Sequence, residues 1–310
     1  MSFIARLFYP NRFDKVRISS VYKAKVLIIG GRSAASKDFA EIYKSRHQAD
    51  IYGLTSKMVT ADSFNGPIKL FEYRNIDKIG SLNFDLVCVF ATRLPHEKLE
   101  LKGFLSVNSK IISVLEKIKY GNDAPRILFI STFSVYPQTS LIISENSKLQ
   151  LDDFYSKSKA LMEQNLFSWG ASRNIPILVA RMPVFLYRNV CTNFMARLMK
   201  ACRSGHNFTL TNIDSPLEAV FDMASLVTMA KCDITANTIV NCSAQPDITF
   251  REIGEIAKGY GLEEVIWREA ARPSTKVSKK QLKNLIGSVP SAKSMILDWF
   301  EKENEKGQTD

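Results

Sequence analysis

The sequence has few residues of the types that build metal centres and disulfide frameworks. It contains three histidines and five cysteines in 310 residues, and no two cysteines stand in a Cys-x-x-Cys spacing. No metal site or disulfide framework is therefore predicted, and a reducing cytoplasm is the expected location. No apolar run approaches the roughly 18 residues that a membrane span needs. Arg6 interrupts the apolar N-terminal residues, so a signal peptide is not predicted either.

The basic excess is confined to two short segments. The chain carries 42 Lys and Arg against 31 Asp and Glu, a formal charge of +11. Residues 1–25 hold six cations and one acid, and residues 271–283 hold five cations and no acid. Because the rest of the chain is nearly balanced, a continuous basic face for nucleic acid is not predicted. Apolar residues among the cations of 1–20 leave peripheral contact with a membrane open, although packing on the protein's own surface is the simpler interpretation.

Short apolar strands alternate with amphipathic helices over the first 180 residues. Strands are predicted at 25–29, 50–54, 68–71, 84–91, 126–132 and 177–180, and helices at 36–47, 107–118, 193–203 and 250–260. This alternation predicts an α/β fold, a Rossmann-like doubly wound parallel sheet covered by helices on both faces. The expected organisation is a basic arm (1–24), a dinucleotide-binding domain (25–183, with a return segment near 219–242), a smaller substrate-binding part (184–300) and a frayed polar tail (301–310).

The first predicted strand ends in a glycine-rich turn. A complete G-x-x-G-x-x-G fingerprint would place glycine at positions 30, 33 and 36. This chain has Gly30, Gly31 and Arg32, with Ser33 and Ser36 at the other two places. A turn of this kind, opening a helix, is where a dinucleotide pyrophosphate binds. We therefore predict phosphate contacts from Gly30, Gly31, Arg32 and Ser33, with an ordinary βα turn as the alternative.

The end of the second predicted strand bears on the choice between NAD and NADP. An acidic residue there normally binds the ribose 2′-hydroxyl of NAD. This chain has Thr55 at that place and Lys57 two residues later. Because no carboxylate is there to repel a 2′-phosphate, and Arg32 and Lys57 could each attract one, the residues favour NADP over NAD. The alternative is that both cations are ordinary surface residues.

A tyrosine and a lysine stand four residues apart after the strand at 126–132. Tyr155 and Lys159 would share one face of a helix. An ammonium one turn away, together with a positively charged nicotinamide, is expected to lower the pKa of a phenol from its usual value near ~10. Thr132 ends the preceding strand and offers a hydroxyl at the edge of the sheet where α/β proteins bind ligands.

Taken in order along the chain, these features resemble an extended short-chain dehydrogenase/reductase of the NAD-dependent epimerase/dehydratase family. The resemblance covers roughly residues 25 to 300. The matching segments are Val-Leu-Ile-Ile-Gly-Gly-Arg-Ser-Ala-Ala-Ser (26–36), 84–91, Ile-Ser-Thr-Phe-Ser-Val-Tyr (130–136), Tyr-x-x-x-Lys (155–159) with Glu163, Val-Ala-Arg-Met-Pro (179–183), 221–224, 240–243 and 285–290.

The resemblance implies roles for particular residues. Tyr155 would be the general acid/base, Lys159 would bind the nicotinamide ribose, and Thr132 would orient the substrate oxygen. Other residues implied at the cofactor or the substrate are Ala91 near the adenosine ribose, Pro183 near the nicotinamide, and Ser134 and Asn193 at the substrate. A homodimer through the helix that carries Tyr155 is also implied.

The chain departs from the family pattern at places that bear on the substrate. Phe133-Ser134 stands where the family's dehydratases carry Asp-Glu, so elimination of water is not expected. Val184 replaces an Asn found in many nucleotide-sugar members, and residues 215–218 lack the Arg that holds a diphosphate. Arg251, Arg197 or the cations of 271–283 are possible substitutes.

Three functions remain open on these residues. The favoured one is an NADPH-dependent reductase of a keto group on a nucleotide-linked sugar. An NAD-dependent nucleotide-sugar epimerase is the first alternative. The second is a non-catalytic NADP-binding regulator or scaffold, against which the intact set of Thr132, Tyr155 and Lys159 argues.

Overall fold

The structure is a computed structural model. It describes residues 23–59, 66–92, 97, 99–120, 126–139, 141–190, 192–211, 214–268 and 275–307. Most of the basic arm, with the membrane contact suggested for 1–20, lies outside the described residues, as do residues 269–274 of the second basic region. Among the described residues, no helix is long and apolar enough to cross a membrane.

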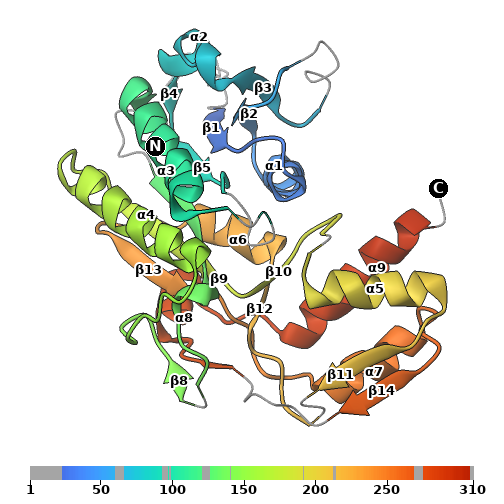
Figure 1. The fold of residues 1–310 in the computed structure, drawn as a ribbon. Helices are drawn as coiled ribbons and strands as arrows, with labels where there is room; N and C mark the ends of the chain where they lie inside the picture. The colour runs from blue at the N-terminus through green and yellow to red at the C-terminus, as the bar shows by residue number, and fades with distance from the viewer. Residues whose placement is uncertain are drawn as a thin grey trace, which may run out of the picture.

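A seven-stranded parallel sheet forms the centre of the molecule (Figure 1), in the order β13-β9-β7-β5-β1-β2-β3. Its strands are β1 (Ala24–Ile29), β2 (Ala49–Thr55), β3 (Lys69–Glu72), β5 (Leu86–Val89), β7 (Arg126–Thr132), β9 (Ile177–Met182) and β13 (Thr238–Asn241). Every neighbouring pair is parallel. The chain winds outward from β1 in both directions, which is the predicted doubly wound arrangement. The carboxyl ends of β1 and β5 flank the reversal point, where such sheets bind ligands.

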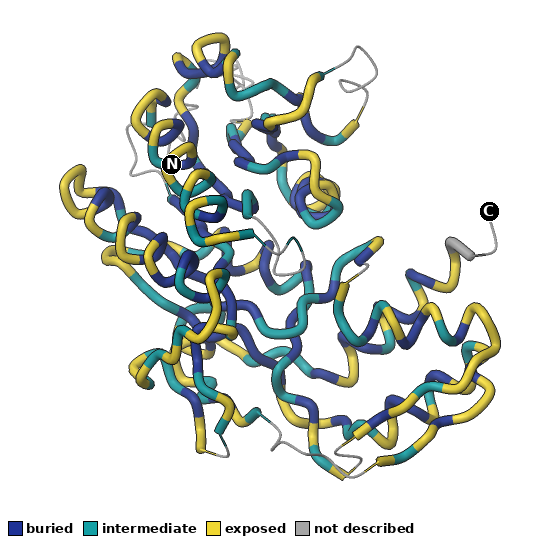
Figure 2. Tube along the Cα trace, viewed as in Figure 1, coloured by how far each residue is buried: buried dark blue, intermediate teal, exposed yellow. Residues whose placement is uncertain are grey.

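Two hydrophobic cores cover the two faces of this sheet. Val26 and Ile28 of β1 join one core with side chains of α1 (Ala34–Arg46) and α6 (Met223–Ala230). Leu27 and Ile29 point the other way, into a core with α3 (Leu101–Lys117) and α4 (Phe154–Ala171). Strand side chains alternate between faces, and both faces of β1 are buried, which explains why its sequence reads as a continuous apolar run. Figure 2 shows the buried strands between helices that are exposed on their outer sides.

The remaining elements form smaller units around the sheet. In Figure 1, α5, α7, α9, β11 and β14 gather away from the central sheet. The helices are η2 (Tyr73–Asn75), α2 (Asp77–Gly80), η4 (Phe133–Val135), α5 (Phe194–Ser204), α7 (Phe250–Lys258), α8 (Lys280–Ile286) and α9 (Ala292–Gly307). The strand pairs are β4 (Asn83–Phe84) with β6 (Lys119–Tyr120), β8 (Ile142–Ile143) with β15 (Lys276–Val277), β10 (Val184–Leu186) with β12 (Val220–Asp222), and β11 (Phe208–Thr211) with β14 (Val265–Arg268).

The expectation of a frayed tail from residue 301 is wrong as far as residue 307. Helix α9 continues to Gly307, and Glu303 is buried within it. Its side chain accepts a hydrogen bond from the backbone N–H of Asn189 at 3.0 Å and lies against the guanidinium of Arg203. A polar composition alone suggested fraying, but these two contacts hold the helix end against the rest of the chain.

Candidate active site

The turn after β1 is shaped by two glycines that no other residue could replace without displacing backbone. Gly30 has φ +94°, and a Cβ on it would lie 2.6 Å from the backbone nitrogen of Ala91 at the end of β5. A Cβ on Gly31 would lie 2.8 Å from the Cα of Gly53 in β2. The turn therefore lies tightly against the ends of both neighbouring strands, as a dinucleotide cradle at the first βα turn requires.

The two serines at the missing glycine positions have different places. Ser33 is the exposed N-cap of α1, and its Oγ accepts a hydrogen bond from the backbone N–H of Ser36 at 3.1 Å. Ser36 is fully buried and its hydroxyl donates to the carbonyl of Gly30 at 2.8 Å. Only Ser33 is therefore placed to meet a phosphate, whereas Ser36 ties the helix to the turn. Strand β1 and helix α1 pack together although position 36 is not glycine, because the buried Ser36 hydroxyl is hydrogen-bonded to the Gly30 carbonyl.

Strand register brings a carboxylate beside the end of β2. Thr55 pairs with Glu72 of β3, and both side chains line one cavity. The guanidinium of Arg32 donates to the carbonyl of Met58 at 2.9 Å, so it reaches from the turn to the loop after β2. Lys57 is exposed on that loop. β2 itself ends without a carboxylate, and the contacts of Arg32 and Lys57 with a cofactor phosphate stay predictions.

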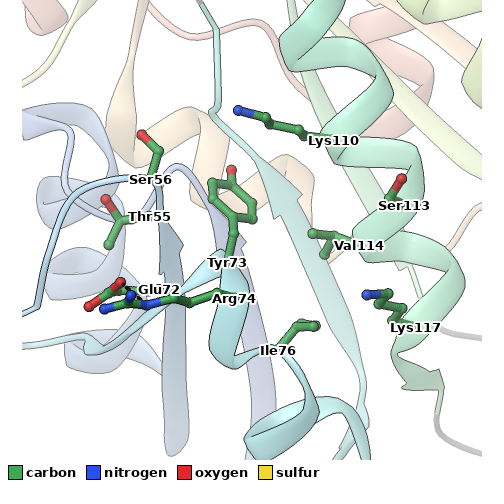
Figure 3. A pocket seen from close by; sticks show the side chains of 10 residues that line it. All are labelled: Thr55, Ser56, Glu72, Tyr73, Arg74, Ile76, Lys110, Ser113, Val114 and Lys117. Carbon is green, nitrogen blue, oxygen red and sulfur yellow. Dashed lines mark ion pairs between the residues drawn. The ribbon is translucent and has the colours of Figure 1, made fainter.

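The cavity at this edge has a volume of about 400 Å³. Figure 3 shows Thr55 and Ser56 on one side, side chains of α3 on the other, and Tyr73 between them. The lining residues are Thr55, Ser56, Glu72, Tyr73, Arg74, Ile76, Lys110, Ser113, Val114 and Lys117. Apart from Thr55, none of these lining residues was predicted from the sequence as a site residue. The strand predicted at 68–71 could have indicated Glu72, because a parallel strand beside β2 places its end next to Thr55. The residues of α3 reach this cavity through packing alone, which leaves no signal in the sequence.

The catalytic residues predicted from the sequence come together at the carboxyl end of β7. Thr132 lies at that strand end, where its hydroxyl acts to lower the pKa of Tyr155, the second residue of α4. The Thr132 hydroxyl donates to the Ser134 hydroxyl at 3.2 Å and accepts from the backbone N–H of Ser134 at 3.1 Å. Asp153 begins α4 with a capping box that its partner Ser156 completes. The ring of Phe104, on α3, packs edge-to-face against that of Tyr155 with centroids 6.3 Å apart.

The predicted lowering of the Tyr155 pKa includes the charge of a bound nicotinamide, and it stays a prediction. The protein's own packing acts in the opposite direction. Burial raises the pKa of Tyr155 to about 12, although the hydrogen bond from Thr132 acts in the opposite direction. The ammonium of Lys159 lies 6.0 Å from the centroid of the Tyr155 ring and donates to the carbonyl of Ile130 at 2.7 Å. Burial lowers the pKa of Lys159 itself to about 7. Loss of hydration is the largest cause of both changes, because packing removes both side chains from water.

A buried ion pair holds the catalytic helix against the sheet. Glu163 lies one turn beyond Lys159, and its carboxylate receives two hydrogen bonds from Arg181 of β9, at 3.1 and 2.6 Å. The hydroxyl of Ser131 donates to the same carboxylate. Arg181 also donates to Tyr136 at 2.5 Å. Because both charged side chains are almost wholly buried, the network fixes the position of α4 relative to β7 and β9.

The residues predicted at the substrate are more scattered. Ser134 is exposed and lines a polar cavity of about 580 Å³ together with Asp153. Pro183 follows β9 and is partly buried. Asn193 is the N-cap of α5: its Oδ1 accepts from the N–H of Ala196 at 3.0 Å and its amide donates to a backbone carbonyl. The structure thus gives Asn193 a capping position, and its predicted contact with substrate stays a prediction.

Some of the cations predicted as possible substitutes for the diphosphate-binding Arg form ion pairs within the protein. Arg251 forms an ion pair with Asp214 at 3.0 Å and lies over the ring of Trp267. In the second basic segment, Lys279 pairs with Glu218 at 2.5 Å. That lysine is therefore engaged by an acidic side chain of the protein itself.

No family model and no curated protein sequence matches this chain. Solved structures do match. A putative epimerase from Burkholderia cenocepacia J2315 is 15% identical, with a TM-score of 0.72 over 93% of this chain and 99% of that one. The UDP-glucuronic acid 4-epimerase from Bacillus cereus, in complex with NAD, is also 15% identical, with a TM-score of 0.72 over 92% and 99%. The UDP-N-acetylglucosamine 4-epimerase from Bacillus cereus is 16% identical, with a TM-score of 0.70 over 93% and 96%.

These similarities show that the chain has the fold of extended short-chain dehydrogenase-type epimerases. They confirm the predicted Rossmann-like fold class and agree with the resemblance drawn from the motifs. The solved neighbours include nucleotide-sugar epimerases in complex with NAD. None of the structures named above gives support to the favoured reductase or to the preference for NADP.

Proposed function

We propose that this protein is an NAD-dependent epimerase that acts on a nucleotide-linked sugar. The observation that carries the proposal is the placement of Thr132 at the carboxyl end of β7 and of Tyr155 at the start of α4, with Lys159 one turn further on, at the same sheet edge as the glycine cradle. The tight approach of Gly30 to Ala91 and of Gly31 to Gly53 fits a dinucleotide at the turn. The fold shared with NAD-bound 4-epimerases adds support.

The roles of the side chains follow from their positions. NAD, held at the turn by Gly30, Gly31 and Ser33, would supply a reversible hydride acceptor for the sugar carbon. Tyr155 would take the proton of the sugar hydroxyl in the first half of the cycle and return it in the second. Thr132 stabilises the phenolate by its hydrogen bond, because that bond lowers the pKa of Tyr155. Lys159 is close enough to the tyrosine to contribute positive charge when protonated.

A second candidate is the NADPH-dependent reductase of a keto nucleotide-sugar. The specific observation that favours it is the Arg32 guanidinium, which lies at the carbonyl of Met58 beside the ribose place. An exchanging reductase would release its oxidised cofactor after each turnover, whereas an epimerase regenerates its cofactor within the cycle.

The experiment is to purify the protein, denature it and identify any released nucleotide, and then to incubate native protein with a panel of UDP-sugars. Retained NAD and formation of an epimer, followed by proton NMR, are expected. Tyr155→Phe should lose at least ~100-fold in rate, because a positioned acid/base contributes about 10²–10⁴. The matched control is Tyr260→Phe, which removes a hydroxyl from a tyrosine stacked on Phe300 outside the site. NADPH consumption with keto sugars, and no epimer formation, would instead establish the reductase.

A further inference from the structure

A short strand pair outside the central sheet presents an apolar residue and a lysine on its outer face (Figure 1). β8 and β15 run parallel, with Ile142 beside Lys276 and Ile143 beside Val277. Ile143 and Val277 are buried, so their side of the pair faces the core. Side chains alternate between the two faces of a strand. Ile142 and Lys276 therefore share the opposite face, and both are exposed.

Further exposed side chains extend this outer face. Leu141, next to β8, is 74% exposed, and Ile142 is 65% exposed. After β15 the chain enters α8, where Lys280 and Lys283 are exposed and stand three residues apart, on one side of the helix. The sequence from 270 to 297 contains no acidic residue. We call this set the β8–α8 surface; it comprises Leu141, Ile142, Lys276, Lys280 and Lys283.

Contacts with the rest of the chain hold this surface in place. The backbone N–H of Ser278, between β15 and α8, donates to the carbonyl of Ile143 at 2.8 Å. Lys279, the N-cap residue of α8, pairs with Glu218 at 2.5 Å. The charge of Lys279 is therefore balanced within the protein, whereas the three exposed lysines carry their charge into solvent. Their position beside β8 does not depend on a bound partner.

The composition of the β8–α8 surface fits lipid headgroups better than a protein. Interfaces between proteins are depleted in lysine and enriched in aromatic residues, methionine and arginine, and this surface has only lysine, leucine and isoleucine. Contact with the same surface of a second copy would set lysines against lysines. Aliphatic side chains that are flanked by lysines suit an anionic membrane, because the former enter the acyl boundary while the latter meet the headgroups.

We propose that the β8–α8 surface docks this protein reversibly on an anionic membrane, with Leu141 and Ile142 at the acyl boundary. Two aliphatic side chains and three lysines give weak, exchanging attachment rather than permanent anchoring. On the inner side of the strand pair, Ile143 and Thr275 line the polar cavity that Ser134 also lines. Docking would therefore bring the rim of the candidate substrate cavity close to the membrane. The proposal concerns attachment and goes beyond the proposed catalytic function.

The test measures co-sedimentation of the full-length protein with vesicles of phosphatidylcholine, with and without about 30% phosphatidylserine. Wild type should bind the anionic vesicles at least ~10-fold more tightly than the neutral ones, and added salt should weaken that binding. The double variant Leu141→Ser/Ile142→Ser should bind the anionic vesicles at least ~5-fold more weakly than wild type. A triple variant that neutralises the surface should bind them at least ~10-fold more weakly; it carries Lys276→Gln, Lys280→Gln and Lys283→Gln.

A second triple variant is the matched control, because it makes the same change in net charge at exposed lysines elsewhere. It carries Lys200→Gln on α5, Lys231→Gln after α6 and Lys258→Gln on α7. This control should bind the anionic vesicles within about threefold of wild type. An equal loss in both triple variants would show that net charge alone attracts the protein, and it would overturn the inference.

Three other results would overturn it as well. They are a wild type that stays unbound, a wild type that binds neutral vesicles equally well, and full binding by both surface variants, which would place the contact elsewhere on the chain. All substituted side chains are exposed, so the variants should fold, and thermal unfolding checks this. The UDP-sugar assay tests the proposed function separately, so a failure of docking leaves that function standing.

Discussion

Replacing the buried catalytic lysine by methionine should make the folded protein more stable at acidic pH while it abolishes activity. Lys159 is 5% exposed, its ammonium donates to the carbonyl of Ile130 at 2.7 Å, and the charge of Glu163 acts on it. Its ammonium also lies 4.7 Å from the centroid of the Phe129 ring. Methionine fills a similar volume and carries no charge to desolvate.

The magnitude follows from the pKa of Lys159, which burial lowers from 10.5 to about 7. At 1.36 kcal/mol per pKa unit, the charged side chain costs the folded state up to about 5 kcal/mol. Loss of the hydrogen bond to Ile130 leaves a buried carbonyl without that donor, which costs about 1–3 kcal/mol. The variant should therefore unfold with a free energy about 2–4 kcal/mol higher than wild type at pH 6.

The pH dependence of the unfolding free energy distinguishes the removal of a buried charge from an improvement in packing. Below pH 7 the lysine is protonated in both the folded and the unfolded chain, so the wild type carries the full penalty. Between about pH 7 and 10.5 the unfolded chain still binds the proton and the folded chain does not, so wild-type stability rises with pH. The advantage of Lys159→Met should thus shrink by about 3 kcal/mol between pH 6 and 9.5.

The assay is guanidinium unfolding of both proteins at the two pH values, with exposed Lys37→Met on α1 as the control. All other titrating groups are common to wild type and variant, so their contributions cancel in the difference. A difference that stays constant between pH 6 and 9.5, or a variant less stable than wild type at pH 6, would refute the reasoning.

Three further outcomes are expected. Glu163→Gln should lower the unfolding free energy by about 3–5 kcal/mol in denaturant titrations, because it leaves the charge of Arg181 buried without its partner; a loss below ~1 kcal/mol would contradict this. Gly30→Ala should lose nucleotide binding, since its Cβ would lie 2.6 Å from Ala91 N at a φ of +94°. In calorimetry it should bind at least ~10-fold more weakly than wild type. Tyr155→Phe should still bind NADH within about threefold of wild type by fluorescence titration, because the lost hydroxyl acts on the proton and not on the cofactor.

The local sequence predicted the strands of the central sheet well because their burial leaves a clear pattern. The segment 126–132 matches β7 at both ends. β1 reads as an unbroken apolar run because both its faces are covered. The tail at 301–307 was mistaken for a frayed end because the contacts of Glu303 come from residues about 100 positions away. No local pattern signals such contacts.

The pKa values of Tyr155 and Lys159 are a second property that the local sequence does not determine. The four-residue spacing placed Tyr155 and Lys159 on one helix, and the structure agrees. Burial of Tyr155 raises its pKa, so the water that the fold excludes opposes the lowering predicted with a bound nicotinamide. Proximity of two charges is visible in a sequence, whereas desolvation is a property of the whole packed environment.

The sequence by itself determined the fold class, the glycine turn and the order of Thr132, Tyr155 and Lys159 along the chain. These are local features, written in hydrophobic periodicity and in the spacing of a few side chains. Only the tertiary structure decided which side chains meet at the end of β2, because Glu72 and Thr55 are 17 positions apart and become neighbours through strand register. A parallel sheet brings strand ends together irrespective of their separation in sequence, so the composition of its edge is fixed by topology.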